Sequence, residues 1–461
     1  MPRVEVEAVT RACVRGLGTE VSVTGLRRLS GGASRETWSF DVERPDGSTE
    51  ALILRRDPGS SIGSTDRSTE YELLRAAGAA GVPVPAVRFL LEPDDDLGDG
   101  FVMTRIDGET IPRKLLRDDE YAQARPRLTA EVARAAAAIH SVPLGALPRL
   151  SRGDIATLLG QYRDLIDLFG EPHPAFELAL RWLSEHAAGL PTGEPALVHG
   201  DLRNGNLIVG PEGLRSVLDW ELAHLGDPVE DLGWFCVKSW RFGNVDRRAG
   251  GFGSAEELLD AYAAASGRRI DPEHLFFWEM YGTLKWGVIC EMQAFSHLNG
   301  LVRSVELAAI GRRVAENEWD LLMLLDPAVT DRPAPEWPET AVDSVHDRPT
   351  ALELVEAVRE YLERDVMAVE GRVGFHARVA SRVLAAVERE MKLGPAQRDA
   401  IVAAHRALLG VDGGSARELQ TELARRIRAG ELADRTEEVH ALVADTVRAK
   451  LAVANPAYLD F

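Results

Sequence analysis

The stretch Leu197-Val-His-Gly-Asp-Leu-Arg-Asn-Gly-Asn-Leu-Ile-Val209, read together with Val217-Leu-Asp-Trp-Glu221, decides the fold of this chain. Two short apolar runs, over residues 207–209 and 214–218, flank a Gly-Pro-Glu-Gly turn. Apolar runs separated by turn-forming residues are typical of a β-hairpin, so we predict two antiparallel strands here. The polar residues of the stretch then lie at the open end of the hairpin, where a site can form.

Two of these polar residues are candidate metal ligands. Asn206 stands just before the first strand and Asp219 just after the second. Antiparallel pairing brings those two ends within a strand spacing or two of each other. An amide oxygen and a carboxylate presented together suit a hard divalent cation such as Mg²⁺. A well-capped turn with polar residues at its mouth is the simpler alternative.

The spacing of His199, Asp201 and Asn206 matches the kinase catalytic loop, in which the Asp accepts the proton of the substrate hydroxyl and the Asn holds metal. Asp219 takes the place of the Asp that binds metal in the kinase Asp-Phe-Gly motif. Taken singly, each of these residues would usually be structural. All four fall at the required offsets within 21 residues, which favours a phosphotransferase.

Residues 20 to about 330 resemble the superfamily of aminoglycoside phosphotransferases and choline kinases, in which His-Gly-Asp replaces the His-Arg-Asp of protein kinases. Three segments are also similar to the kinase domains associated with acyl-CoA dehydrogenases: Gly31-Gly-Ala-Ser-Arg-Glu-Thr-Trp38, Leu54-Arg-Arg56 and Leu218-Asp-Trp-Glu-Leu-Ala-His-Leu-Gly-Asp-Pro228. The resemblance implies an α+β, protein-kinase-like fold with a small antiparallel-sheet lobe and a larger, mainly helical lobe. It also implies ATP as phosphate donor, Mg²⁺ as cofactor and Asp201 as the catalytic residue.

A glycine-rich loop in the small lobe is the candidate cover for the nucleotide phosphates. We expect strands in this lobe over residues 25–29, 37–42 and 51–55. The loop joining the first two consists of Ser30, Gly31, Gly32, Ala33 and Ser34. Its small side chains let backbone N–H groups approach an anion closely. An ordinary glycine-rich hairpin turn is the alternative, which the downstream motif disfavours.

Arg55 is the candidate cation for the phosphates. Kinases carry a Lys on the third strand, but no Lys precedes Lys114 in this chain. A planar guanidinium could bind phosphate through two parallel bonds, unlike a compact ammonium. Glu70, on a helix expected over residues 66–77, falls where the Glu of the family pairs with this cation. Arg56 alternates to the opposite face of the strand, where we expect it to meet solvent.

Three further residues take their expected roles from the resemblance. The segment Phe101–Gly108 resembles the strand and hinge where backbone groups hold adenine, and Met103 is the candidate within it. Asp231 resembles the residue that braces the catalytic loop by hydrogen bonds. His140 is expected to be a core residue rather than a ligand.

The composition indicates a cytoplasmic protein that binds neither nucleic acid nor membrane. Of the net charge of −20, residues 351–461 carry −2, from 18 acidic and 16 basic residues, so −18 lies in residues 1–350. A chain this acidic lacks the basic footprint that nucleic acid requires. No apolar run approaches the ~20 residues of a membrane span. Three widely spaced cysteines argue against a disulfide framework and for a reducing cytoplasm.

We expect four parts in the chain: an N-terminal kinase-like lobe (1–107), a C-terminal kinase-like lobe (108–325), a Pro-rich linker (326–349) and an all-α helical bundle (350–461). Periodic segments predict the bundle helices over 352–366, 373–391, 397–409, 416–427 and 438–451. The bundle resembles a helical domain of uncharacterised function that accompanies such kinases. It could bind a protein partner or mediate self-association.

These observations together favour an ATP-dependent phosphotransferase that acts on a hydroxyl group of a small molecule. The acceptor stays open between a hydroxyacyl thioester and an aminoglycoside-like polycation. Two alternatives remain: a nucleotide-binding pseudokinase, which Arg55 in place of Lys supports best, and a scaffold that acts through the helical bundle.

Overall fold

The computed structural model describes residues 4–29, 36–57, 67–191, 193–340 and 348–460. Two compact units make up the chain: unit 1 is Met1–Asp154 with Pro191–Glu279, and unit 2 is Ile155–Leu190 with Met280–Phe461. The expected four-part division of the chain stays a prediction.

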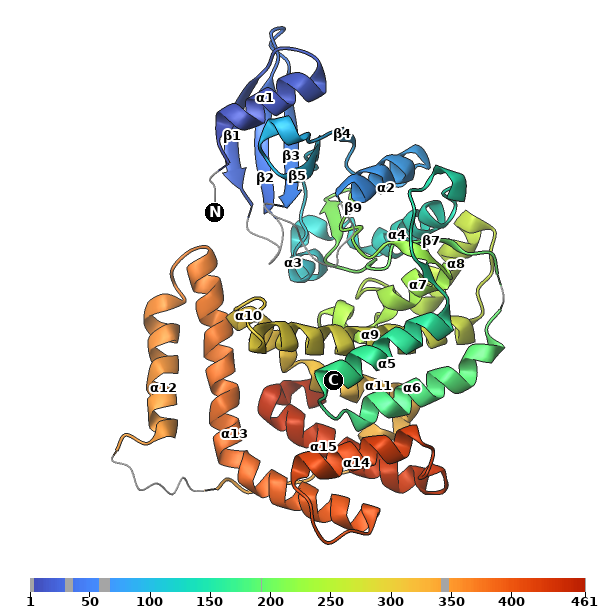
Figure 1. Cartoon of the computed structure of the whole chain (residues 1–461), viewed down its shortest axis with the longest axis vertical. Coiled ribbons are helices and arrows are strands. Elements are labelled where there is room, and N and C mark those ends of the chain that lie inside the picture. Colours follow the sequence, from blue (N-terminus) through green and yellow to red (C-terminus); the bar gives the residue numbers. More distant parts are fainter. Residues whose placement is uncertain (1–3, 30–35, 58–66, 192, 341–347, 461) are drawn as a thin grey trace. The chain divides into compact units, whose positions relative to one another are not determined.

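Unit 1 begins with a five-stranded antiparallel sheet in the order β1-β2-β3-β5-β4. The strands are β1 (Ser22–Arg28), β2 (Glu36–Glu43), β3 (Thr49–Asp57), β4 (Val87–Leu90) and β5 (Asp99–Thr104). Helix α1 (Val6–Leu17) lies on one face of this sheet, where its apolar residues share a core with Phe40, Leu52 and Leu54 (Figure 1). Helix α2 (Arg67–Ala79) packs against β4 and β5.

The expectation that Arg56 meets solvent is wrong. Its side chain is buried on the α1 face of β3. Its Nε donates to Glu36 Oε2 at 2.9 Å, and its Nη1 donates to the Leu97 carbonyl at 2.9 Å. Glu36 is the cross-strand partner of Arg56 in the β2–β3 register, so the two charges neutralise each other inside the sheet. Strand alternation alone did not reveal that α1 and the chain around Leu97 cover this face.

The rest of unit 1 is mainly helical and carries the predicted catalytic hairpin. Its helices are α3 (Pro112–Arg117), α4 (Arg125–His140), α7 (Val229–Cys236) and α8 (Ala255–Ser266). The hairpin forms as expected, from β8 (Leu207–Gly210) and β9 (Gly213–Val217). A small sheet beside it has the order β6-β10-β7, from Arg152–Gly153, His224–Gly226 and Ala196–Val198. Strand β7 leads directly into the catalytic loop.

Unit 2 is helical throughout its described elements. They include α5 (Ile155–Phe169), α6 (Pro174–His186), α10 (Val305–Gly311), α11 (Val314–Leu325), α12 (Ala351–Tyr361), α13 (Arg372–Leu409), α14 (Ala416–Arg428) and α15 (Thr436–Ala454), with α9 (Pro272–Leu298) entering from unit 1. One core joins Trp319 and Leu322 of α11 to Leu423 of α14 and Val443 of α15. The C-terminal helices therefore share their core with helices that precede the predicted linker.

The prediction of separate helices over 373–391 and 397–409 is wrong, because α13 runs unbroken from Arg372 to Leu409 through Pro395. A proline inside a helix removes one backbone hydrogen bond and strains the preceding turn. Contacts to α15 hold the helix on both sides of this proline: Arg389 donates to the Val453 carbonyl at 2.7 Å, and Gln397 donates to the Ala449 carbonyl at 3.2 Å.

Across the described ranges, no helix is both long enough and apolar enough to span a bilayer.

Candidate active site

The hairpin of β8 and β9 brings two predicted metal ligands together. Leu207 pairs with Val217 in its register, and the Leu218 N–H donates to the Asn206 carbonyl at 2.8 Å. Asn206 and Asp219 therefore stand at adjacent ends of paired strands. The backbone of Asp219 is left-handed, with φ of 68°, which few residues other than Gly, Asn and Asp adopt without cost. The left-handed backbone at Asp219 ends the extended conformation of β9 directly after the hairpin.

Asp201 lies beside Asn206 at the mouth of the hairpin. The Asn206 side-chain amide donates to Asp201 Oδ2 at 2.6 Å and to the Asp201 carbonyl at 3.0 Å. The other carboxylate oxygen, Oδ1, accepts from Arg203 Nε at 3.0 Å and from Trp234 Nε1 at 2.9 Å. These bonds fix the orientation of the carboxylate. They also turn the Asn206 amide nitrogen toward Asp201, so its oxygen is the atom available to a cation.

The fully buried carboxylate of Asp231 holds the catalytic loop through hydrogen bonds to its backbone. Asp231 accepts from the N–H groups of His199 and Gly200, at 2.8 and 2.9 Å, and contacts His140 Nε2 at 3.0 Å. Burial acts to raise the pKa of Asp231, but these hydrogen bonds and the neighbouring histidines outweigh it and hold the pKa below its usual value. Asp231 and His140 therefore occupy the bracing and core positions that we expected.

Gly200 allows the loop to make its tight turn. Its φ is 78°, a left-handed value, and a Cβ atom there would lie 2.3 Å from the Leu222 carbonyl oxygen. The next residue, Asp201, donates its N–H to His199 Nδ1 at 3.1 Å. Burial lowers the pKa of His199, which keeps its imidazole neutral and able to accept this bond.

Arg55 connects the sheet, helix α2 and the hairpin. Its Nη1 lies 2.7 Å from Glu70 Oε1, and its Nη2 lies 3.4 Å from Asp219 Oδ1. Burial opposes the charge on Arg55, but Glu70 and Asp219 outweigh burial and raise its pKa above the usual value. Glu70 also contacts Arg67, whose Nε donates to Asp57 Oδ2 at 2.9 Å. The buried Glu70 is therefore held by two guanidinium groups.

Met103 and the glycine-rich loop are the remaining residues that we predicted to bind the nucleotide. Met103 lies buried in β5, paired with Ile53 of β3, next to the strand that carries Arg55. The glycine-rich loop formed by Ser30, Gly31, Gly32, Ala33 and Ser34 lies outside the described residues.

Three residues at this site were not predicted from the sequence. Arg203 and Trp234 bind Asp201 directly, and the Arg203 guanidinium lies over the ring of Trp240 at 4.7 Å. Arg203 could have been noted as a cation two residues after the candidate catalytic Asp. Trp234 lies three residues after Asp231 on α7, one helical turn along the same face.

The residues at the hairpin mouth fit a Mg²⁺ ion. Mg²⁺ is usually held by one or two protein oxygens together with waters and substrate phosphates. The Asn206 amide oxygen and the Asp219 carboxylate, of which 34% is exposed, supply two such oxygens. Arg55 lies beside Asp219, so a cation and the anionic phosphates would both find an opposite charge here.

The sequence profile described as the phosphotransferase enzyme family matches residues 25–271, slightly more than half of the chain. The chain belongs to this family. A domain of unknown function matches residues 367–458.

Acyl-CoA dehydrogenase family member 10 of Mus musculus is 32% identical over 203 residues, which are 40% of this chain and 18% of the mouse protein. Acyl-CoA dehydrogenase family member 11 of Homo sapiens is 26% identical over 295 residues, 59% of this chain and 36% of the human protein. The 4-hydroxytryptamine kinase of Psilocybe cyanescens is 23% identical over 329 residues, 63% of this chain and 89% of that enzyme. The chain thus spans only a minor part of the dehydrogenase relatives.

Among solved structures, a candidate aminoglycoside phosphotransferase of Ralstonia eutropha superposes with a TM-score of 0.55 at 22% identity, covering 70% of this chain and 99% of that one. The α+β, protein-kinase-like fold expected from the sequence is confirmed, and so is the enzyme class, a phosphotransferase.

Proposed function

We propose that this chain is an ATP-dependent phosphotransferase that transfers the γ-phosphate to a hydroxyl group of a small molecule. The observation that carries the proposal is the double contact of Arg55, with Glu70 on α2 and with Asp219 after the hairpin. A guanidinium held between a buried carboxylate and a candidate metal ligand is placed to meet nucleotide phosphates.

In this proposal Asp201 orients the acceptor hydroxyl and accepts its proton. Asn206 and Asp219 hold Mg²⁺, which when bound neutralises charge on the phosphates. Arg55, which lies beside Asp219, adds positive charge for the phosphates, and its contact with Glu70 holds the guanidinium in place. The segment around Met103 and the loop Ser30–Ser34 remain our candidates for holding adenine and phosphates. Transfer through a loose, in-line transition state needs alignment and charge stabilisation above all.

The chemical class of the acceptor can be proposed from the residues beside Asp201, the relatives of the chain and its charge. Arg203 and Trp240 form a cation–aromatic pair beside that carboxylate. We favour a hydroxylated acceptor of the acyl thioester type, because the relatives include acyl-CoA dehydrogenase family members. The acidic character of residues 1–350 would suit a polycationic acceptor instead.

Three buried, free cysteines support a reducing, cytoplasmic setting.

The test is a panel of hydroxylated acceptors, incubated with ATP and Mg²⁺ and analysed by mass spectrometry for a gain of one phosphate group. Hydroxyacyl thioesters, aminoglycosides and hydroxylated amines form its three arms. The expected result is phosphorylation in one arm by the wild-type chain and loss of that product with Asp201→Asn. Product formation that is unchanged in Asp201→Asn would contradict the roles proposed here.

A nucleotide-binding pseudokinase is the second candidate, because both carboxylate oxygens of Asp201 already accept hydrogen bonds from Asn206, Arg203 and Trp234. A carboxylate held in this way could serve structure alone. Binding of Mg-ATP without turnover on any arm of the panel would favour this candidate. Turnover in any arm would exclude it.

A further inference from the structure

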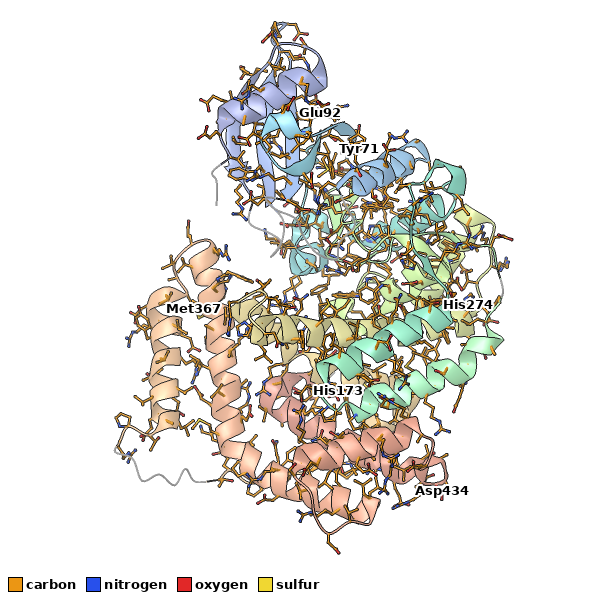
Figure 2. All side chains as sticks on the ribbon, viewed as in Figure 1. Tyr71, Glu92, His173, His274, Met367 and Asp434 are labelled. Carbon is orange, nitrogen blue, oxygen red and sulfur yellow. The ribbon has the colours of Figure 1, made fainter. Side chains whose placement is uncertain are left out.

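A helical arm in unit 2 carries exposed large apolar side chains more densely than the rest of the described chain. The arm consists of residues 351–390, which form α12, a short π-helical turn and the first half of α13. Figure 1 shows α12 lying beside α13 at the edge of unit 2, away from α14 and α15. Met367, labelled in Figure 2, lies in the connection between the two helices.

Large apolar side chains on the arm remain open to solvent. Sixteen large apolar residues are exposed in the described part of the chain, and six of them fall between residues 354 and 375. They are Leu354, Val358, Tyr361, Val369, Val373 and Phe375, with 44–55% of each exposed. The first three repeat at the spacing of one helix face, so α12 carries an apolar stripe along its length. Clusters of this kind mark interaction surfaces more often than scattered single residues do.

The arm also lacks a complete core of its own. No residue of α12 is fully buried. Up to residue 390, the buried positions of α13 hold only small or polar residues: Gly374, Ala377, Ser381, Ala386 and Glu388. Other large apolar residues of the arm stay partly exposed, among them Val355, Leu362, Val383 and Val387. A pair of helices covers only part of each apolar face, whereas four helices can enclose a core.

The charges of the two helices are opposite and equal. Helix α12, residues 351–361, carries three acidic side chains and one basic side chain, a net charge of −2. The first half of α13, residues 372–390, carries four basic and two acidic side chains, a net charge of +2. Among the basic residues, Arg372, Arg378 and Arg382 are exposed. An identical arm turned through a two-fold axis would place each acidic helix beside a basic helix of the other copy, as a self-complementary interface requires.

We propose that the arm is a dimerisation surface, on which the α12–α13 pair of a second copy of this chain completes a four-helix bundle. The apolar stripe of α12 lies in the core of that bundle, and the four helices alternate in charge around it. The second copy is favoured over a different protein because the arm supplies both the exposed apolar face and the two opposite charges that match it. This inference is independent of the proposed phosphotransferase activity.

Sedimentation velocity of the full-length chain over a range of concentrations tests the proposal. The wild-type chain should sediment as a dimer. Val358→Glu combined with Tyr361→Glu places two charges in the stripe and should give a monomer. The matched control is Leu168→Glu on α5, where a leucine 64% exposed lies outside the arm. This control should remain dimeric.

A second variant tests the charges alone. Arg378→Glu combined with Arg382→Glu changes only exposed positions of α13 and makes both helices of the arm acidic. The expected result is at least a tenfold rise in the dimer dissociation constant, with an unchanged circular dichroism spectrum. A wild-type chain that is monomeric at all concentrations would overturn the proposal. A dimer that persists in the Val358→Glu, Tyr361→Glu variant would overturn it as well, because the interface would then lie elsewhere.

Discussion

Arg55 Nη1 lies 2.7 Å from Glu70 Oε1, in a contact where Glu70 has no exposed surface and Arg55 very little. A buried ion pair is favourable only when its remaining polar atoms are also satisfied. Here the second Arg55 nitrogen reaches Asp219, and the second Glu70 oxygen reaches Arg67, which is anchored on Asp57. The position of the Arg55 guanidinium is therefore set by a chain of charges rather than by a single contact.

This arrangement predicts that Arg55→Lys will not improve the enzyme, although Lys is the usual residue in kinases. A single ammonium cannot reproduce two contacts made by separate guanidinium nitrogens. We expect Arg55→Lys to raise the apparent KM for ATP, and Arg55→Ala to raise it further. Glu70 keeps its contact with Arg67 in both variants, so the fold should survive. Steady-state kinetics with varied ATP measures the effect.

Arg56→Lys is the matched control for that experiment. Arg56 is the next residue on β3, is more deeply buried than Arg55, and pairs with Glu36 on the opposite face of the sheet. Its substitution should lower the melting temperature but leave the KM for ATP within about twofold, since its contacts lie away from Asp219. An increase in activity with Arg55→Lys would show instead that the guanidinium is only tolerated at position 55.

Asp201→Asn should reduce phosphoryl transfer while leaving nucleotide binding near normal. Its melting temperature should fall, because the new NH2 group faces a hydrogen-bond donor that the carboxylate accepted from. The amide is the same size as the carboxylate but cannot accept the acceptor proton, and a general base contributes typically ~10²–10⁴-fold. Turnover on the acceptor identified by the panel gives the measurement. Asp399→Asn is the control, because the side chain of this aspartate is 73% exposed and lies on α13, outside unit 1. Equal turnover in both variants would remove Asp201 from the mechanism.

Asp219→Ala should weaken binding of Mg-ATP more than Asn206→Ala does, because a carboxylate attracts a divalent cation more strongly than a neutral amide. Isothermal titration of Mg-ATP into each variant compares the two affinities. Asn206→Ala also removes a hydrogen bond to Asp201, so it should lower turnover beyond its effect on binding. Unchanged affinity in both variants would show that the metal site lies elsewhere.

The sequence predicted the hairpin and the residues around it because their spacing is local. Asn206, Asp219 and Asp201 lie within 21 residues of His199, and antiparallel pairing fixes their neighbourhood. The burial of Arg56 could not be predicted in the same way, since it depends on α1 and on the Leu97 carbonyl, 41 residues away. The contact of Trp234 with Asp201 likewise depends on how α7 packs, which no motif encodes.

A histidine in unit 2 whose side chain is only 11% exposed predicts a pH dependence of stability. His173, labelled in Figure 2, contacts Glu318 at 3.1 Å and Glu291 at 3.5 Å, and Lys450 also contacts Glu318. Burial acts to lower the pKa of His173, but the hydrogen bonds to the two glutamates outweigh it and raise the pKa from 6.5 to about 9. The pKa of Glu318 is lowered to about 2, so its charge persists through this range.

A histidine whose pKa is raised by folding stabilises the protein fully below its unfolded pKa and loses that contribution as the pH rises through the folded value. The wild-type melting temperature should therefore fall between pH 6.5 and 9. His173→Gln should flatten this part of the profile relative to the wild type, whereas His186→Gln, at an exposed position, should not. Differential scanning fluorimetry across this range compares the three proteins. Parallel profiles would mean that His173 is not protonated in the fold.

Leu423 on α14 tests whether the C-terminal helices are part of the fold of unit 2. Its side chain has no exposed surface and lies in the core that includes Trp319 and Leu322 of α11. Leu→Ala at a buried site costs about 2–5 kcal/mol, because apolar contacts are lost and a cavity remains. Leu423→Ala should therefore lower the denaturant midpoint of unit 2, while Leu168→Ala, at an exposed position, should change stability by less than about 0.5 kcal/mol. Tryptophan fluorescence follows the transition, and Trp319, one of the nine tryptophans of the chain, lies in the same core. If α14 packed only on the surface of unit 2, Leu423→Ala and Leu168→Ala would unfold at the same denaturant midpoint.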